Sequence, residues 1–381
     1  MRLELSKRTA IALTVALIVV GCAWSWNSLT NLPWHLGLLD DEPSLSETRL
    51  LLTSDDLQQF QPDVVIANAY PPRVDPPVIS VEEASRKIDD SELVLGVQIN
   101  GEAIAIPVNM LTGPSRTIIN LEVDGIPLAI TWCELCHHGV VFRREVGERV
   151  LTFQVSGMLW HESLVMRDVE TESLWAQSLG KSMAGTLKGT LLAIEPSQLL
   201  SWKNWKRAVP HTQAIVMERT RTDLTTDYYH RRGEELFVIG AEQNQQARHW
   251  PYQLLKASRG INDRLDGAPV WLTMESDGCG VNLFSRIAAS RELTIVLRQD
   301  EWFDEETWST WDPSSGKALS GPLAGTQLKR LPCQVSLETA WFAFHAESSS
   351  DFFAPENFVE ASEVLGDWND DGDDASNLFD Q

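Results

Sequence analysis

The sequence predicts a strand-dominated α+β protein in which two tandem, pseudo-symmetric copies of one β-rich unit follow an N-terminal signal or anchor segment. Short runs that alternate apolar and polar residues, with turn signals between them, are typical of strands. Several motifs occur twice at a nearly constant spacing, which indicates a duplication. With 43% hydrophobic residues among 381, the chain has enough apolar side chains for a globular core.

The formal net charge of −23 restricts the partners. Phosphate binding needs clustered Lys and Arg residues, so the charge argues against a nucleic-acid partner. The excess of acidic side chains is typical of a solvated surface.

The N-terminus predicts export. A basic segment, residues 2–8, precedes an apolar run, residues 10–20, as in a secretory signal. The run ends in "VVGC", a lipobox pattern in which cleavage would leave Cys22 as a lipidated N-terminus. The alternative is an uncleaved anchor helix that extends to about residue 26, at the short limit for a bilayer span. Both interpretations place the body in the cell envelope, outside the cytoplasm and attached to the membrane.

The elements follow one another in a regular order. A tether with a helical lead-in precedes the Pro-rich residues 70–80, and "EEASRKI" after them has a helical pattern. From residue 93 onward the chain shows short strands, and "FRREVGERVLTFQV" predicts a hairpin around Gly147 and Glu148. The predicted segments are a signal peptide or anchor (1–22), the tether (23–69), copy one (70–220), copy two (221–350) and an acidic tail (351–381).

The internal repeat supports two copies of one domain. "DGIPLAITW" at Asp124 recurs 142 residues later as "DGAPVWLTM" at Asp266, and "FRREVGERVLTFQV" recurs as "FSRIAASRELTIVL" at the same offset. "LWAQSLGKSMAGTLKGT" then aligns with "TWDPSSGKALSGPLAGT", where Trp175 matches Trp311 at an offset of 136. Two copies of this length indicate a duplicated domain rather than a solenoid.

Features present in only one copy are candidates for function. Copy one contains "CELC", with Cys133 and Cys136, where copy two has "ESDG". Ser156 and His161 are also unmatched in copy two.

The favoured hypothesis is a thiol–disulfide redox site with Cys133 and Cys136 as the catalytic pair. His137 and His138 follow directly, and nearby imidazolium groups lower the pKa of a thiol. Exchange would then run through a mixed disulfide with a protein thiol partner and would need no cofactor. We expect Ser156, His161 and both adjacent histidines to line this site.

Three other interpretations remain open at this point. As a metal-binding knuckle, Cys133 and Cys136 would supply half of a tetrahedral zinc or copper site, with His137 as a further ligand. The spacing Cys-x-x-Cys-His also matches a c-type haem attachment site. Finally, the pair could be a structural disulfide in a lipoprotein without catalysis.

The chain resembles the family catalogued as domain of unknown function 3179 over about residues 70–348. The resemblance rests on "PLAITWCELC", "VLTFQVSGMLWHESLVMRD", "ETESLWAQ", "SGPLAGTQLKRLP" and "AWFAFHAE". Members typically carry Cys-Pro-Leu-Cys-Gly, and some are annotated with selenocysteine, which implies redox use of the motif. The family's activity is uncharacterised, so the resemblance implies no reaction. Here Glu134 replaces the proline, and His137 and His138 replace the small residues.

The remaining cysteines lead to a further prediction. The offsets place Cys279 opposite His137 and Cys333 opposite Ser197. In an oxidising compartment, a Cys279–Cys333 disulfide would stabilise copy two by about 2–4 kcal/mol. Pseudo-symmetry would then place Ser197 beside the dithiol turn of copy one, where it could donate a hydrogen bond to a thiolate.

Overall fold

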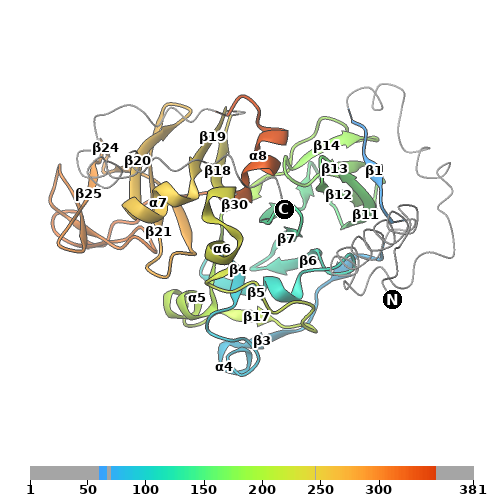
Figure 1. Ribbon diagram of the computed structural model, residues 1–381, viewed down its shortest axis with the longest axis horizontal. Helices are drawn as coiled ribbons and strands as arrows, with labels where there is room; N and C mark the ends of the chain where they lie inside the picture. The colour runs from blue at the N-terminus through green and yellow to red at the C-terminus, as the bar shows by residue number, and fades with distance from the viewer. Residues whose placement is uncertain (1–59, 67–69, 245, 349–381) are drawn as a thin grey trace, which may run out of the picture. The chain divides into compact units, whose positions relative to one another are not determined.

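The computed structural model describes residues 60–66, 70–244 and 246–348, and strands dominate it (Figure 1). Strands make up 47% and helices 13%, which confirms the strand-dominated α+β class. The chain divides into two compact units, of which the first ends at Tyr228 and the second begins at Tyr229.

The N-terminal signal or anchor, most of the tether and the acidic tail lie outside the described residues. In the described part, no helix combines the length and apolar character needed to cross a membrane.

Unit 1 contains three five-stranded sheets. In spatial order, the first sheet consists of β1 (Asp63–Val64), β11 (Phe153–Trp160), β12 (Ser163–Asp168), β13 (Leu174–Ala176) and β14 (Lys181–Ala184). The second consists of β15 (Ile194–Glu195), β8 (His138–Arg143), β7 (Ile126–Cys133), β6 (Ile118–Val123) and β2 (Arg73–Val74). The third consists of β16 (Ser197–Ser201), β4 (Leu93–Ile99), β5 (Glu102–Pro107), β17 (Gln213–Ile215) and β3 (Val78–Ser80).

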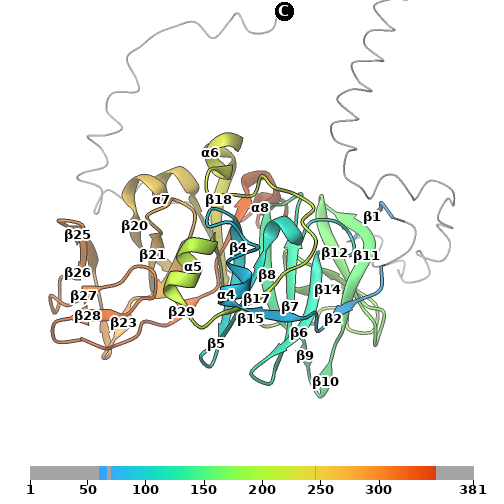
Figure 2. The same ribbon diagram turned by 90° about the horizontal axis from the view of Figure 1, so that it is seen from below.

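The predicted hairpin around Gly147 and Glu148 is present but short. It joins β9 (Glu145–Val146) to β10 (Arg149–Val150) and projects beyond the strands that flank it (Figure 2). Those strands, β8 and β11, belong to different sheets. The hairpin is therefore the connection between the second and first sheets.

The first and second sheets are joined by Asn120 of β6. Its side chain donates to the Phe153 carbonyl at 2.8 Å and accepts from the Phe153 N–H at 2.8 Å. A buried amide that is satisfied in this way fixes β11 against β6. β11 and β12 are thereby held beside the hairpin of β7 and β8.

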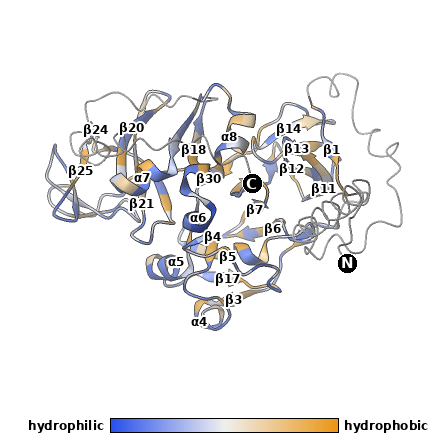
Figure 3. Ribbon diagram, viewed as in Figure 1, coloured by the Kyte–Doolittle hydropathy of each residue, from blue (hydrophilic) through white to orange (hydrophobic). Residues whose placement is uncertain are grey.

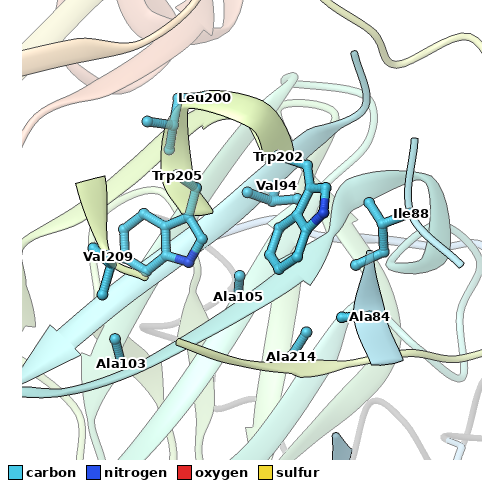
Figure 4. Packing of buried hydrophobic residues seen from close by; sticks show 10 residues of the cluster. All are labelled: Ala84, Ile88, Val94, Ala103, Ala105, Leu200, Trp202, Trp205, Val209 and Ala214. Carbon is cyan, nitrogen blue, oxygen red and sulfur yellow. The ribbon is translucent and has the colours of Figure 1, made fainter. Parts of the chain in front are cut away.

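The core of the third sheet lies under a helix that carries two tryptophans. Trp202 and Trp205 of α5 (Trp202–Ala208) point onto β4 and β5, where small side chains leave room for the indoles (Figure 4). A Cβ on Gly96 of β4 would lie 2.6 Å from the Trp205 ring, so only glycine fits there. Ser201 caps the helix by accepting from the Asn204 N–H at 3.2 Å.

The other helices described in unit 1 are also short. The "EEASRKI" segment forms a single turn, α4 (Val81–Ala84), which Ser80 caps. The 3₁₀ turn η2 (Val108–Met110) follows β5, and α6 (Tyr228–Arg232), which is strongly hydrophilic in Figure 3, begins at the end of unit 1. The predicted helix after the Pro-rich segment is thus confirmed only in its first turn.

Unit 2 contains three further sheets. The first consists of β19 (Gln246–Pro251), β18 (Phe237–Gln243) and β30 (Gln334–Leu337). The second consists of β20 (Gly260–Leu265), β21 (Ala268–Met274), β22 (Val281–Ser285) and β29 (Arg330–Leu331). The third consists of β25 (Ile295–Arg298), β26 (Glu301–Asp304), β27 (Thr310–Trp311) and β28 (Ala318–Ser320). The remaining elements are η3 (Glu234–Leu236), α7 (Tyr252–Ser258), the hairpin β23 (Ile287–Ala288) and β24 (Arg291–Glu292), and α8 (Glu338–Phe344).

His345, at the end of α8, is expected to make the stability of unit 2 sensitive to acid. Burial lowers the pKa of His345 to about 4, even though Glu242 Oε2 lies 3.9 Å from its Nδ1 atom. The unfolded chain takes up a proton near pH 6.5, whereas the folded unit does so only near pH 4. The contribution of neutral His345 to the free energy of unfolding is therefore fully present above pH 6.5 and is lost as the pH falls toward 4.

We expect the unfolding free energy of unit 2 to fall by about 2–3 kcal/mol across this window from His345 alone. Urea unfolding at several pH values, followed by tryptophan fluorescence, measures the slope of the unfolding free energy against pH. The slope should become shallower in His345→Gln. The control is His230→Gln, because the His230 side chain is 82% exposed. An unchanged slope in His345→Gln would contradict this prediction.

Candidate functional site

The Cys-x-x-Cys motif forms the turn of a β-hairpin in unit 1. β7 ends at Cys133 and β8 begins at His138, and these residues are the last pair in the register of the two strands. Leu135 at the tip is about half exposed, whereas Cys133 and Cys136 expose only 3% and 0% of their surface. The dithiol therefore lies directly beneath a surface turn.

The two sulfur atoms are in hydrogen-bonding contact. Cys133 Sγ lies 2.9 Å from Cys136 Sγ and accepts from the Cys136 N–H at 3.4 Å. Cys136 Sγ lies 3.7 Å from the carbonyl oxygen of Glu162, which can only accept, so Cys136 is the donor of that contact. The single thiol proton of Cys136 therefore has two acceptors within reach, Cys133 Sγ and the Glu162 carbonyl oxygen.

The two thiols differ in their affinity for a proton. Burial alone would raise the pKa of Cys133, but hydrogen bonds from the thiol and backbone N–H of Cys136 outweigh it. The Leu164 N–H and the Ser163 hydroxyl add to this effect, and the pKa of Cys133 is lowered. The hydrogen bond to Cys133, followed by burial, raises the pKa of Cys136 far above its ordinary value. Cys133 is the sulfur that ionises first.

The hairpin of β11 and β12 brings the other contacts to the sulfurs. Its register shifts between Val155 and Leu159, at a bulge that contains Gly157 with a φ of +83°. A Cβ on Gly157 would lie 2.3 Å from the Ile66 carbonyl oxygen, so glycine is required at this approach. The bulge directs the hairpin tip, which includes Glu162, over Cys136.

A chain of buried polar side chains extends away from the sulfurs. Ser163 Oγ lies 2.6 Å from Ser178 Oγ, which lies 3.3 Å from His138 Nε2. His138 Nε2 also lies 2.7 Å from Gln177 Oε1, and Gln177 Nε2 donates to Thr131 Oγ1 at 2.9 Å. Thr131 lies in β7, His138 begins β8 and Ser163 begins β12. All five side chains of this chain are at most 9% exposed.

His137 has a packing role in the structure. Its ring stacks on Tyr228 with the centroids 4.4 Å apart and meets the edge of Trp132 at 5.1 Å. Its φ of +53° lies in the left-handed region that closes the turn. A charged contact on the turn itself joins Glu134 to Arg221, which donates to Glu134 Oε1 at 2.6 Å.

The structure brings only part of the predicted site together. His138 belongs to the polar chain that reaches the sulfurs. Ser156 donates instead to the Val165 carbonyl at 2.7 Å and stabilises the bulge of β11. His161 lies exposed in the hairpin turn, tilted against Trp160, and Ser197 begins β16 in the third sheet.

Sequence reasoning missed Ser163, Ser178, Gln177 and Thr131. Gln177 has a detectable signal, because copy two has Pro313 at the matching position. Ser178 has no such difference between the copies, since Ser314 occupies the matching position.

The predicted Cys279–Cys333 disulfide is absent from the described residues. β22 pairs with β29 at Leu283 and Leu331. Cys279 precedes Leu283 by four residues, but Cys333 follows Leu331 by two, so the two cysteines are out of register. The Cys279 thiol instead donates to the Asp277 carbonyl at 3.7 Å. The argument that placed Ser197 at the site depended on this disulfide and loses its support.

Within the described ranges, no three His, Cys, Asp or Glu side chains converge as a metal site requires. His137, the further ligand in the metal and haem hypotheses, would have to leave its contacts with Trp132 and Tyr228. Over the residues that the structure describes, Cys133 and Cys136 are thus not joined by a third side chain in a metal-binding cluster.

Together, these features define a strand-dominated protein whose first unit holds a buried dithiol at a hairpin turn. The chain belongs to the family described as "Protein of unknown function (DUF3179)", whose model matches residues 68–348. The family resemblance in the sequence is thereby confirmed. No curated protein and no solved structure matches the chain.

The contact between Glu134 and Arg221 is expected to stabilise the turn. The two side chains are 21% and 24% exposed, and Arg221 also donates to Asp223. A double-mutant cycle with Glu134→Gln and Arg221→Gln should give a coupling of about 0.5–1.5 kcal/mol in the unfolding free energy.

The matched control is the exposed pair of Glu83 and Lys87, whose side chains are 47% and 48% exposed. Its coupling should stay below about 0.5 kcal/mol because solvent screens it. Equal coupling in both cycles would contradict the larger contribution expected from the partly buried pair of Glu134 and Arg221.

Proposed function

We propose that this is an exported, envelope-anchored protein that exchanges thiols and disulfides through Cys133 and Cys136. The observation that carries the proposal is the geometry of the pair, in which two buried sulfurs lie 2.9 Å apart beneath a hairpin turn and Cys133 Sγ accepts from the Cys136 N–H. The lowered pKa of Cys133 supports it. A nucleophilic thiolate beside a protonated partner is the arrangement that exchange requires.

The proposed exchange begins with the Cys133 thiolate. It attacks a disulfide of a partner protein, a new S–S bond forms as the partner's S–S bond breaks, and the released thiolate takes up a proton. Cys136 then loses its proton and attacks Cys133 Sγ, which releases the partner as a dithiol. Two electrons pass from the pair to the partner, and the reverse sequence oxidises a partner dithiol.

The proposal includes a duplication in which only copy one has this chemistry. β6, β7, β8 and β15 pair in the same order as β20, β21, β22 and β29, and β11 to β14 pair as β25 to β28 do. Matched side chains make matched contacts. Trp175 donates to Asp168 Oδ2 at 2.9 Å, and Trp311 donates to Asp304 Oδ2 at 2.9 Å.

The two units differ where the site lies. β11 and β12 have eight and six residues, whereas β25 and β26 have four each. The extra residues of unit 1 include Glu162, Ser163 and Leu164, which contact the sulfurs. Glu275 occupies the position that matches Cys133. The cysteines and the hairpin tip that covers them are thus absent from unit 2 together, which supports a common function.

Mass analysis of the purified full chain tests this proposal. We expect a reversible two-hydrogen mass difference between the reduced and oxidised protein, confined to the peptide that contains Cys133 and Cys136. The reduced protein should bind no stoichiometric zinc or copper. One equivalent of metal that is lost in Cys136→Ser would contradict the proposal.

The envelope location rests on the sequence alone, because Cys22 lies outside the described residues. In the host, Cys22→Ala is expected to abolish incorporation of labelled palmitate and to retain the uncleaved N-terminus. A substitution without effect on labelling or N-terminal mass would remove the lipoprotein part of the proposal and favour the anchor helix.

A further inference from the structure

The polar chain beside the dithiol has a direction that the contacts fix. Thr131 Oγ1 lies 2.7 Å from the Val140 carbonyl oxygen, which only accepts, so the Thr131 hydroxyl donates to it. Because its proton is used in this way, Thr131 Oγ1 can only accept from Gln177. The donor is the amide nitrogen Nε2 of Gln177, 2.9 Å away. The amide oxygen of Gln177 must then face His138.

This orientation determines the tautomer of His138. Gln177 Oε1 lies 2.7 Å from His138 Nε2 and can only accept, so Nε2 carries a proton. The same N–H faces Ser178 Oγ at 3.3 Å, and the oxygen of Ser178 is its second acceptor. Because Ser178 accepts from His138, its own proton is directed toward Ser163 and the sulfurs.

The end of the chain reaches both cysteines. Ser178 Oγ and Ser163 Oγ are 2.6 Å apart, and one of the two hydroxyls donates to the other. Ser163 directly follows Glu162, whose carbonyl oxygen lies 3.7 Å from Cys136 Sγ. The Ser163 hydroxyl acts to lower the pKa of both thiols, and the Ser178 hydroxyl acts to lower that of Cys136. With His138 donating to Ser178 and Ser178 donating to Ser163, the Ser163 hydroxyl proton is the one left to point at the pair.

Hydrogen bonds of this kind are not equally strong in the two redox states. A thiolate or thiol sulfur accepts hydrogen bonds, and the bond is strongest to the ionised form. A disulfide sulfur is a far weaker acceptor. A donor chain aimed at the pair therefore stabilises the dithiol relative to the disulfide, and stabilising the reduced form makes a disulfide a stronger oxidant.

We propose that His138, Ser178 and Ser163 form a donor chain, oriented by Gln177, that makes the Cys133–Cys136 disulfide an oxidant of protein dithiols. This inference rests on the proposed exchange function and assigns its direction and substrate class. In the step, two thiols of the substrate become a disulfide, and the Cys133–Cys136 bond is reduced to two thiols. Two electrons and two protons pass from the substrate to the pair. Ser163 is placed to contact the reacting sulfurs, whereas His138 and Gln177 act through the serines as positioning residues.

The test is the equilibrium of the full chain with a dithiothreitol redox buffer, measured as the reduced fraction by alkylation and mass analysis. Removing a hydrogen bond to a charged group should shift the equilibrium constant toward the disulfide about tenfold, which is about 30 mV for a two-electron couple. We expect this shift in Ser178→Ala and in Ser163→Ala. Ser178→Thr, which retains a hydroxyl, should restore the value to within about threefold of the original protein.

The matched control is Ser182→Ala. Ser182 is buried in β14 of the same unit, and its hydroxyl faces only the carbonyls of Leu174 and Ala184. Its equilibrium constant should stay within about twofold of the unsubstituted chain. If the serine variants acted through a general loss of packing, the equilibrium constant of Ser182→Ala would shift as well. If they act through the donor chain, the equilibrium constant of Ser182→Ala stays unchanged.

The outcomes separate the two proposals. If the unsubstituted pair shows no reversible two-electron transition, the exchange function fails and the donor chain fails with it. If the pair cycles but Ser178→Ala and Ser163→Ala match Ser182→Ala, only the donor chain is wrong. If one variant fails to fold by urea unfolding, the other still decides, and Gln177→Leu provides a third variant in which the tautomer of His138 is no longer fixed.

Discussion

Replacing Cys133 with Ser is expected to abolish disulfide exchange, whereas replacing Cys136 with Ser is expected to trap a mixed disulfide. In the proposed exchange, Cys133 has the lowered pKa and attacks first, so without it no bond to the partner should form. Cys136 resolves that bond, and without it the partner stays attached to Cys133. Non-reducing electrophoresis and intact mass after incubation with a disulfide-containing peptide measure the adduct.

The remaining cysteines of the described chain provide the control. Cys279→Ser and Cys333→Ser should leave adduct formation unchanged, because burial raises the pKa of Cys333 to about 12 and the Cys279 thiol donates to the Asp277 carbonyl oxygen. An adduct that persists in Cys133→Ser, or one trapped by Cys279, would reverse the assignment of the nucleophile.

Asp168→Ala is expected to be the most destabilising single substitution in the first sheet, at about 3 kcal/mol. Asp168 is fully buried and accepts from the Thr171 N–H at 2.6 Å, from the Thr171 hydroxyl and from Trp175 Nε1. Removing the carboxylate deprives the buried Trp175 Nε1–H and the Thr171 N–H of this acceptor. Urea unfolding followed by fluorescence measures the loss.

Two matched variants test whether this loss of stability comes from the acceptor oxygens of the buried carboxylate. Asp168→Asn keeps one acceptor oxygen and should lose about half as much. Asp304→Ala removes the corresponding carboxylate in unit 2, which accepts from Thr307, Ser309 and Trp311, and should cost a similar amount. If the units unfold separately, each variant should move only its own transition. A loss below about 0.5 kcal/mol for Asp168→Ala would show that the buried carboxylate is not needed.

Much of the fold could be predicted because it depends on local pattern. Alternating runs predicted a strand-dominated protein, and the Gly147–Glu148 turn predicted the hairpin that connects two sheets. The comparison of the two predicted copies selected Cys133 and Cys136, which occur in only one of them. The comparison could not select Ser178, because Ser314 occupies the matching position in copy two. The role of Ser178 depends on its contact with Ser163, for which copy two has no counterpart.

The rest of the site depends on three-dimensional register. Ser163 reaches the sulfurs only because the hairpin of β11 and β12 is longer than its counterpart and bends at Gly157. The Cys279–Cys333 prediction was wrong for a related reason. A constant offset aligns residues between copies, but it does not say which residues face each other across two strands within one copy.

The reduction potential of the Cys133–Cys136 pair in the full chain tests the central claim most directly. The protein is equilibrated over a series of redox buffers, and free thiols at the two positions are counted by alkylation and mass analysis. We predict one reversible two-electron transition at a potential above about −300 mV, the range in which disulfides exchange rather than serve as structural bonds. A pair that stays oxidised to well below that potential, or never forms a disulfide, would contradict the redox function.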